Sequence, residues 1–137
     1  MIVIDSSAVI AIFRQEADAA GYAQSIAADD DPLISAANVL EASIVLRGLK
    51  EIPAAKAERW FDDFIETAGI RIEAVTPEQA QAARLAHLRF GKGTGHKAAL
   101  NYGDCFAYAL AKTLDAPLLC KGNDFGETDI VLAKTGL

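Results

Sequence analysis

The sequence predicts an α/β fold in three layers, an α/β/α sandwich with helices on both faces of a mainly parallel central sheet. Short apolar runs, often β-branched, alternate along the chain with longer segments of helical character. That alternation is typical of a parallel sheet whose strands are connected through helices. At 137 residues, the chain fits a single domain over residues 1–137, long enough to bury a hydrophobic core.

The first half of the chain is expected to contain two strands and three helices. A buried strand over residues 2–4 ends at Asp5, and Ser6 and Ser7 are both good caps for a helix that ends near Glu16. A second helix is expected over residues 17–28, before the helix-breaking Asp-Asp-Asp-Pro stretch at 29–32. A minimal strand at 33–34 then leads into an apolar helix over residues 36–49.

The second half continues the alternation. Pro53 can begin a helix that runs to about Ala68, and residues 70–75 alternate enough to form a strand. Thr76 and Gln79 form a capping box around Pro77, which predicts a helix over residues 76–90 and a Gly-rich loop at 91–95. A last strong helix is expected over residues 104–115, then a strand at 117–121 and a turn at 122–124.

The charge distribution bears on nucleic-acid binding. A net charge of −6 argues against a surface that is basic throughout. Residues 79–103, however, contain no acidic side chain, and four cations there are candidate contacts to a nucleic-acid backbone: Arg84, Arg89, Lys92 and Lys97. The alternative is an ordinary helix with a solvated, charged face. Tyr102 or Phe90 could stack on an unpaired base.

Other features bear on location. No apolar run reaches the roughly 18 residues of a membrane span. Asp5 interrupts the opening stretch, which lacks the basic start of a signal peptide. Cys105 and Cys120 form no CxxC motif and are too few for a zinc site, so they fit buried thiols in a reducing compartment. We therefore expect a soluble, cytoplasmic protein that makes no membrane contact.

Four carboxylates stand out by position. Asp5 and Asp124 each follow a strand, and ligands of parallel sheets bind at strand carboxyl ends. Asp104 begins a helix, and Glu41 stands alone on a largely apolar one. Each also has an ordinary explanation, because caps and turns favour Asp and Glu41 can face solvent or a distant arginine. If the fold brings the four together, their repulsion calls for Mg²⁺ or a similar ion, which can activate water for phosphodiester hydrolysis.

Four stretches resemble, in order and spacing, PIN-domain ribonucleases, and most closely the VapC toxins of bacterial VapBC toxin–antitoxin pairs: MIVIDSSA, SAANVLEASIVL, NYGDCFAYALAKT and LLCKGNDFGETDI. The resemblance covers essentially the whole chain. It implies a PIN-like α/β/α fold and an endoribonuclease that depends on Mg²⁺ or Mn²⁺. It also implies a homodimer, and a VapB-type antitoxin that inserts a segment, often with a basic side chain, at the active site.

The resemblance implies site residues as well. The family's acidic positions fall on four residues of this chain, which would act as metal ligands and catalytic groups: Asp5, Glu41, Asp104 and Asp124. Ser6 matches the hydroxyl that follows the family's first Asp. Asn123 stands where the family often has Asp, so that Glu127 or Asp129 remains an alternative source of the fourth ligand.

Two other functions fit parts of the pattern. An aspartyl phosphatase of the haloacid-dehalogenase type would use Asp5 as nucleophile, but it requires a second Asp where this chain has Ser7. A non-catalytic PIN-like interaction module would keep the fold without the acidic set, which is complete here. A Walker loop at 91–97 lacks the glycine-lysine ending, and His87 and His96 fit no Ser–His–Asp motif.

Overall fold

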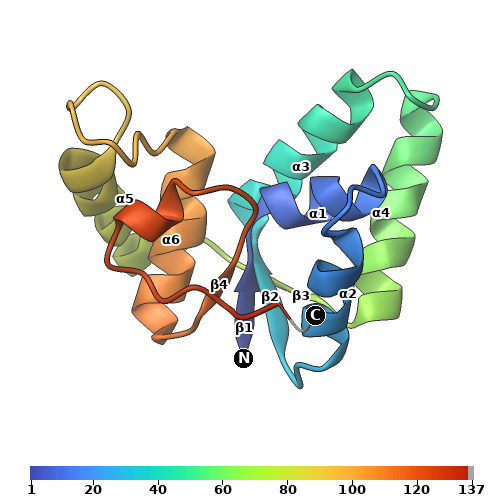
Figure 1. Ribbon diagram of the computed structural model, residues 1–137, viewed down its shortest axis with the longest axis horizontal. Helices are drawn as coiled ribbons and strands as arrows, with labels where there is room; N and C mark the ends of the chain where they lie inside the picture. Colours follow the sequence, from blue (N-terminus) through green and yellow to red (C-terminus); the bar gives the residue numbers. More distant parts are fainter. Residues whose placement is uncertain (136–137) are drawn as a thin grey trace.

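A computed structural model describes residues 1–135 of the chain. Its four strands form one parallel sheet in the order β3-β2-β1-β4: β1 (Ile2–Ile4), β2 (Pro32–Ser35), β3 (Arg71–Glu73) and β4 (Leu118–Leu119). The sheet lies between two layers of helices (Figure 1), which confirms the three-layer α/β/α architecture expected from the sequence.

The helices divide unequally between the two faces of the sheet. Two lie on one side, α5 (Pro77–Phe90) and α6 (Tyr102–Leu114). Four lie on the other side: α1 (Ser6–Phe13), α2 (Ala19–Ala27), α3 (Ala36–Gly48) and α4 (Ala54–Ala68). A short 3-10 helix, η1 (Phe125–Glu127), follows β4. Within residues 1–135, no helix combines the length and apolar character needed to cross a bilayer.

Successive side chains along the strands belong in turn to two hydrophobic cores, one on each face of the sheet. Val3 and Leu118 belong to the core beneath α5 and α6, whereas the next residues along, Ile4 and Leu119, belong to the core beneath α1 to α4. This follows from strand geometry, in which successive side chains point to opposite faces. Burying side chains of this size contributes about 1.5–3 kcal/mol each, so both faces hold the sheet in place.

Most element boundaries differ from the expected ones by a few residues. Helix α1 ends at Phe13 rather than near Glu16, because Gln15 has a left-handed φ of 53° that a continuing helix excludes. The strands expected at 70–75 and 117–121 shorten to residues 71–73 and 118–119, since only these pair with β2 and β1. Helix α6 begins at Tyr102, two residues before the expected start.

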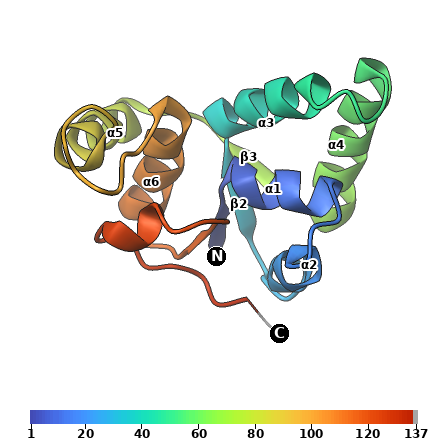
Figure 2. The ribbon, with the colours of Figure 1, turned by 45° about the horizontal axis from the view of Figure 1, so that its top comes forward.

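All strands run in one direction, so their carboxyl ends share one edge of the sheet. The first turns of α1 and α3 directly follow β1 and β2 there, and the start of α6 lies beside them (Figures 1 and 2). Helices α3 and α6 are joined at this edge by a hydrogen bond of 2.9 Å from Asn38 Nδ2 to the Gly103 carbonyl. Three helix starts therefore surround the place where parallel sheets bind ligands.

Candidate active site

Asp5 lies at the centre of this edge. Its backbone N–H donates to the Leu119 carbonyl of β4 at 2.9 Å, and its Oδ2 accepts the Ser7 backbone N–H at 3.0 Å. Asp5 is thus the N-cap of α1, and the expectation that Ser6 or Ser7 caps this helix is wrong, because their hydroxyls bond elsewhere. The side chain is only 2% exposed, and its Oδ1 is buried without a hydrogen-bond partner among residues 1–135.

Glu41 reaches the same edge from α3. Its Oε1 accepts hydrogen bonds from the Ser6 hydroxyl of α1 and, at 3.1 Å, from Asn38 Nδ2. The carboxylate therefore neither points freely into solvent nor pairs with a distant arginine. The Ser6 hydroxyl, which the family resemblance singled out, thus lies against this carboxylate.

Asp104 comes from the first turn of α6. Its backbone N–H donates to Asn101 Oδ1 at 2.9 Å, and its Oδ2 accepts the Asn101 N–H at 3.0 Å, which completes a capping box. Asn101, rather than Asp104, is the N-cap of this helix. The box uses one carboxylate oxygen of Asp104 and fixes the direction in which the other points.

These carboxylates lie close enough to one another for their charges to interact. Burial raises the pKa of Asp5 to about 7, against the bonds from Ser7, and the charges of Asp104 and Glu41 raise it further. Burial also raises the pKa of Asp104 to about 6, opposed by the Asn101 N–H and reinforced by Glu41 and Asp124. Groups from four separate stretches of sequence therefore repel one another at one edge of the sheet.

The fourth acidic position is the most exposed. Asp124 precedes η1, and its charge acts on Asp104. The two alternatives are paired elsewhere: Glu127 with Lys97 Nζ at 3.2 Å, and Asp129 with Lys112 Nζ at 3.0 Å and the Tyr108 hydroxyl. Asn123 is exposed at the same turn, where its carbonyl accepts the Gly126 N–H.

Ser7 ties the loop that carries Asp124 to the site. Its Oγ accepts the Lys121 backbone N–H at 2.9 Å, while its own N–H bonds Asp5. The Lys121 ammonium pairs with Glu16 and Asp18 at 3.1 and 3.3 Å, on the segment after α1. Sequence reasoning missed this role of Ser7, because nothing in the local pattern indicates a partner 114 residues away.

The donor set suits a hard divalent cation, although the side chains are not gathered around one as they stand. Within residues 1–135, no three His, Cys, Asp or Glu side chains are placed to hold an ion together. The buried Oδ1 of Asp5, which has no hydrogen-bond partner there, is nevertheless an oxygen that could bind a divalent cation. Burial, with the nearby carboxylates, raises the pKa of Cys120 to about 12, so this thiol is protonated in the metal-free protein.

The four cations that are candidate RNA contacts lie on α5 and on the loop before α6, and all four are exposed: Arg84, Arg89, Lys92 and Lys97. Arg89 and Lys97 pair with Asp129 and Glu127 at 3.7 and 3.2 Å, whereas the Arg84 guanidinium donates to the Gln81 side chain. These pairs are exposed and therefore weak, which leaves the cations available to a phosphate backbone.

The two candidate stacking residues differ. Tyr102 is 80% exposed at the start of α6, where its ring meets Phe106 edge-on. Phe90 is buried against Tyr108 and His96, so the expectation that it could stack on a base is wrong.

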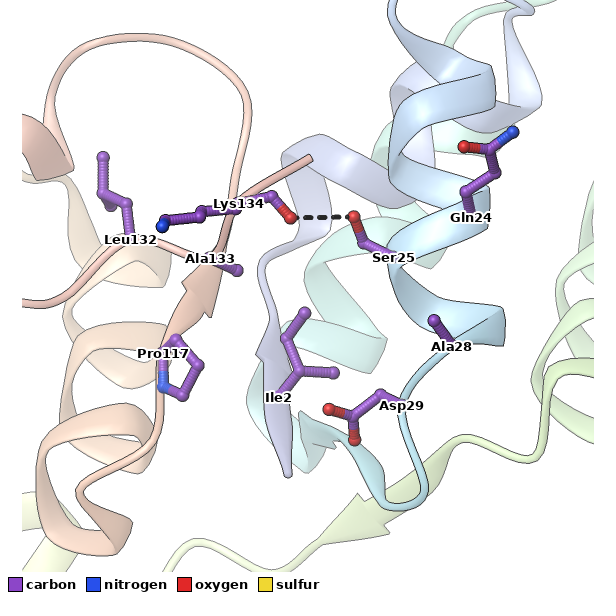
Figure 3. Close-up of a pocket in the computed structure, with 9 residues that line it drawn as sticks. All are labelled: Ile2, Gln24, Ser25, Ala28, Asp29, Pro117, Leu132, Ala133 and Lys134. Atoms are coloured by element: carbon purple, nitrogen blue, oxygen red, sulfur yellow. Dashed lines mark hydrogen bonds between the residues drawn. The ribbon is translucent and has the colours of Figure 1, made fainter. Parts of the chain in front are cut away.

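A cavity of about 540 Å³ lies away from the carboxylates, at the start of β1 (Figure 3). The 132–134 segment forms one wall, held by a hydrogen bond of 3.0 Å from Ser25 Oγ to the Lys134 carbonyl. Asp29 is its one carboxylate and pairs with the N-terminal ammonium at 3.2 Å. The cavity therefore lacks the converging acidic groups of the other edge.

The parallel sheet and its acidic edge define a PIN-domain protein, and residues 2–131 match the family model described as "PIN domain". The chain is 48% identical over 128 residues to "Ribonuclease VapC28" of Mycobacterium tuberculosis, covering 93% of this chain and 94% of that protein. It belongs to the PIN-domain family and, within that family, to the VapC ribonucleases.

Solved structures agree on the fold. M. tuberculosis VapC20, described as a Sarcin-Ricin loop cleaving toxin, superposes with a TM-score of 0.77 at 15% identity, covering 98% of this chain and 99% of that one. VapBC2 from Rickettsia felis, bound to a DNA fragment from their promoter, gives 0.74 at 15% identity, covering 97% and 98%. At such identities the likeness concerns the fold alone.

Proposed function

We propose that this chain, acting as one domain, is a metal-dependent endoribonuclease and the toxin of a toxin–antitoxin pair. The observation that carries the proposal is the convergence of Asp5, Glu41 and Asp104 at the carboxyl edge of the sheet, where the charges of Glu41 and Asp104 act on Asp5 and that of Glu41 acts on Asp104. Close relatives bear the name ribonuclease, which supports RNA as the substrate.

The residues take distinct roles. Asp5 and Asp104 would hold Mg²⁺ or Mn²⁺, with Asp124 completing the site from the loop after β4. When bound, the ion would supply positive charge that makes a water more acidic and offsets charge on the attacked phosphate. Glu41, held by the Ser6 hydroxyl, would help to hold the ion or would accept the proton of the attacking water. No side-chain nucleophile is required.

RNA approaches along the basic residues. We assign phosphate contacts to the cations of α5 and of the loop that follows it: Arg84, Arg89, Lys92 and Lys97. Tyr102 lies two residues before Asp104 and is exposed, so it can stack on an unpaired base beside the cleaved bond. The substrate and the two free thiols fit action in the cytoplasm.

The partner proposed is a VapB-type antitoxin protein. A fold relative, VapBC2 of Rickettsia felis, includes one by name. A basic side chain of the antitoxin, placed at the acidic edge, would relieve the repulsion that raises the pKa values of Asp5 and Asp104. We also propose that the toxin is a homodimer, as its family resemblance implies.

Asp104→Asn tests the proposed function. The purified variant should lose at least about 100-fold of its Mn²⁺-dependent RNA cleavage, because a charged metal ligand is gone, and it should be no less stable to heat than the wild type. Asp115→Asn is the matched control, since Asp115 ends the same helix in a left-handed conformation that Asn tolerates. Cleavage by Asp104→Asn at the wild-type rate, or full cleavage in EDTA, would contradict the proposal.

A further inference from the structure

Asn38 occupies a place where its residue type is costly. It is 0% exposed on the first turn of α3, after Ser35 has already capped that helix. Asn is a poor residue for a helix interior, by up to about 0.7 kcal/mol relative to Ala. A buried amide adds a further cost unless its groups are hydrogen-bonded. A buried Asn at this position therefore indicates a function that an apolar side chain could not serve.

The contacts of the amide identify that task. Both hydrogens of Asn38 Nδ2 are used, one by Glu41 Oε1 at 3.1 Å and the other by the Gly103 carbonyl at 2.9 Å. Two acceptors fix the amide's orientation, because a flipped amide would press its oxygen against two others. In this orientation the Oδ1 atom has no hydrogen-bond partner among residues 1–135. That unpaired oxygen costs free energy, but the same orientation keeps both N–H groups hydrogen-bonded.

These two bonds connect the candidate ligands. Glu41 lies on α3, and Gly103 directly precedes Asp104 on α6. A single side chain thus holds the Glu41 carboxylate at a set distance from the backbone that carries Asp104. The Ser6 hydroxyl holds the same carboxylate oxygen from α1. Without such donors, repulsion by Asp5 and Asp104 would drive Glu41 toward solvent.

Given the function proposed above, on which this step rests, we infer that Asn38 is a positioning residue: it presents Glu41 to the divalent ion in register with Asp104. The residue touches neither the ion nor RNA in this role. It acts through Glu41, and its loss matters only while Glu41 is present.

A double-mutant cycle on Mn²⁺ affinity tests the inference, with Mn²⁺ titrated into the RNA-free protein. Asn38→Leu removes both donors at similar volume and should weaken Mn²⁺ binding about 10-fold, as loss of an orienting partner does in other metal sites. Glu41→Ala should also weaken binding, and the double variant should bind no more weakly than Glu41→Ala alone. The smaller, polar Asn38→Ser carries the same expectation if Asn38→Leu does not fold.

Gln79→Leu provides the control, because Gln79 is another buried amide, on α5, that contacts none of the four carboxylates by a hydrogen bond. It should change stability without changing Mn²⁺ affinity. Wild-type affinity in both Asn38 variants, or an equal loss with and without Glu41, overturns the positioning role alone. Absence of Mn²⁺ binding by the wild-type chain overturns both this role and the proposed function.

Discussion

The carboxylate of Glu41 lies directly against the α-carbon of Gly103. A Cβ atom added to Gly103 would stand 1.6 Å from Glu41 Oε2 and 2.3 Å from its Cδ, far inside contact distance. The Glu41 carboxylate of α3 therefore occupies the space beside α6 in which a side chain on Gly103 would stand. The residue before Asp104 has to be glycine if Glu41 is to keep its place.

Gly103→Ala should displace Glu41 and weaken the protein. We expect a loss of about 1 kcal/mol in the free energy of unfolding, because the carboxylate is the flexible end of a side chain but gives up its bonds from Ser6 and Asn38 when it moves, together with reduced RNA cleavage. Gly48→Ala is the control, since nothing lies within 4 Å of a Cβ there and Ala favours a helix. Urea denaturation of both variants makes the comparison, and equal stability of Gly103→Ala and wild type would show that the carboxylate has room to move.

The stability of the metal-free protein should depend on the protonation of Asp5 and Asp104. Their pKa values of about 7 and about 6 exceed the ordinary 3.8, so the folded chain binds these protons more tightly than the unfolded chain. The stability that they contribute is full below about pH 4 and is lost as pH rises to about 7. Asp5→Asn should remove part of this fall and be the more stable protein at pH 7.5 in EDTA.

Saturating Mn²⁺ should reverse that order. Metal binding displaces the protons, so the ion's stabilisation of the wild type grows with pH, while Asp5→Asn gains little. Thermal unfolding from pH 4 to pH 8, with and without Mn²⁺, measures both effects. The same pH dependence in wild type and Asp5→Asn would show that Asp5 does not titrate in this window.

Ser7→Ala should loosen the loop that carries Asp124. It removes the bond from the Lys121 N–H to Ser7 Oγ but keeps the backbone bond to Asp5, so we expect about 1 kcal/mol of lost stability and slower cleavage. Ser25→Ala loses bonds to the Gly21 and Lys134 carbonyls at the other end of the sheet and should cost stability only. Full activity in Ser7→Ala would mean that the loop holds its place without this bond.

Neutralising Lys92 and Lys97 together should flatten the salt dependence of RNA binding. Each lost phosphate contact lowers the slope of log affinity against log salt by about 0.7 for single-stranded RNA. Binding is measured in the cleavage-deficient Asp104→Asn chain, with exposed Lys56 on α4 changed to Gln as the control. An unchanged slope would remove these two lysines from the RNA-binding surface.

The sequence predicts elements better than it predicts their caps. The alternation of apolar runs with helical segments predicts the parallel sheet, because a strand that is buried on both faces can be recognised locally as a continuous apolar run. The caps were misassigned at α1 and α6, since Asp5 and Asn101 compete with equally good neighbours and tertiary contacts decide between them. Phe90 looked available to a base, yet packing beneath α5 and α6 buries it.

For the candidate site, the sequence likewise predicts the carboxylates better than the side chains that hold them in place. Asp5, Glu41 and Asp104 could be chosen from their positions and from the family resemblance. The side chains that hold them could not, because Ser7 and Asn38 act on partners 114 and 65 residues away, and no local pattern encodes such distances. Nothing in the sequence distinguishes Gly103 from the other glycines, and only the structure shows that the Glu41 carboxylate of α3 lies against it.

The order β3-β2-β1-β4 places the first strand of the chain next to the last. Asp5 donates its backbone N–H to Leu119 across that seam, so its edge of the sheet is complete only when β4 is in place. Translation that stops before β4 therefore leaves the acidic centre unassembled.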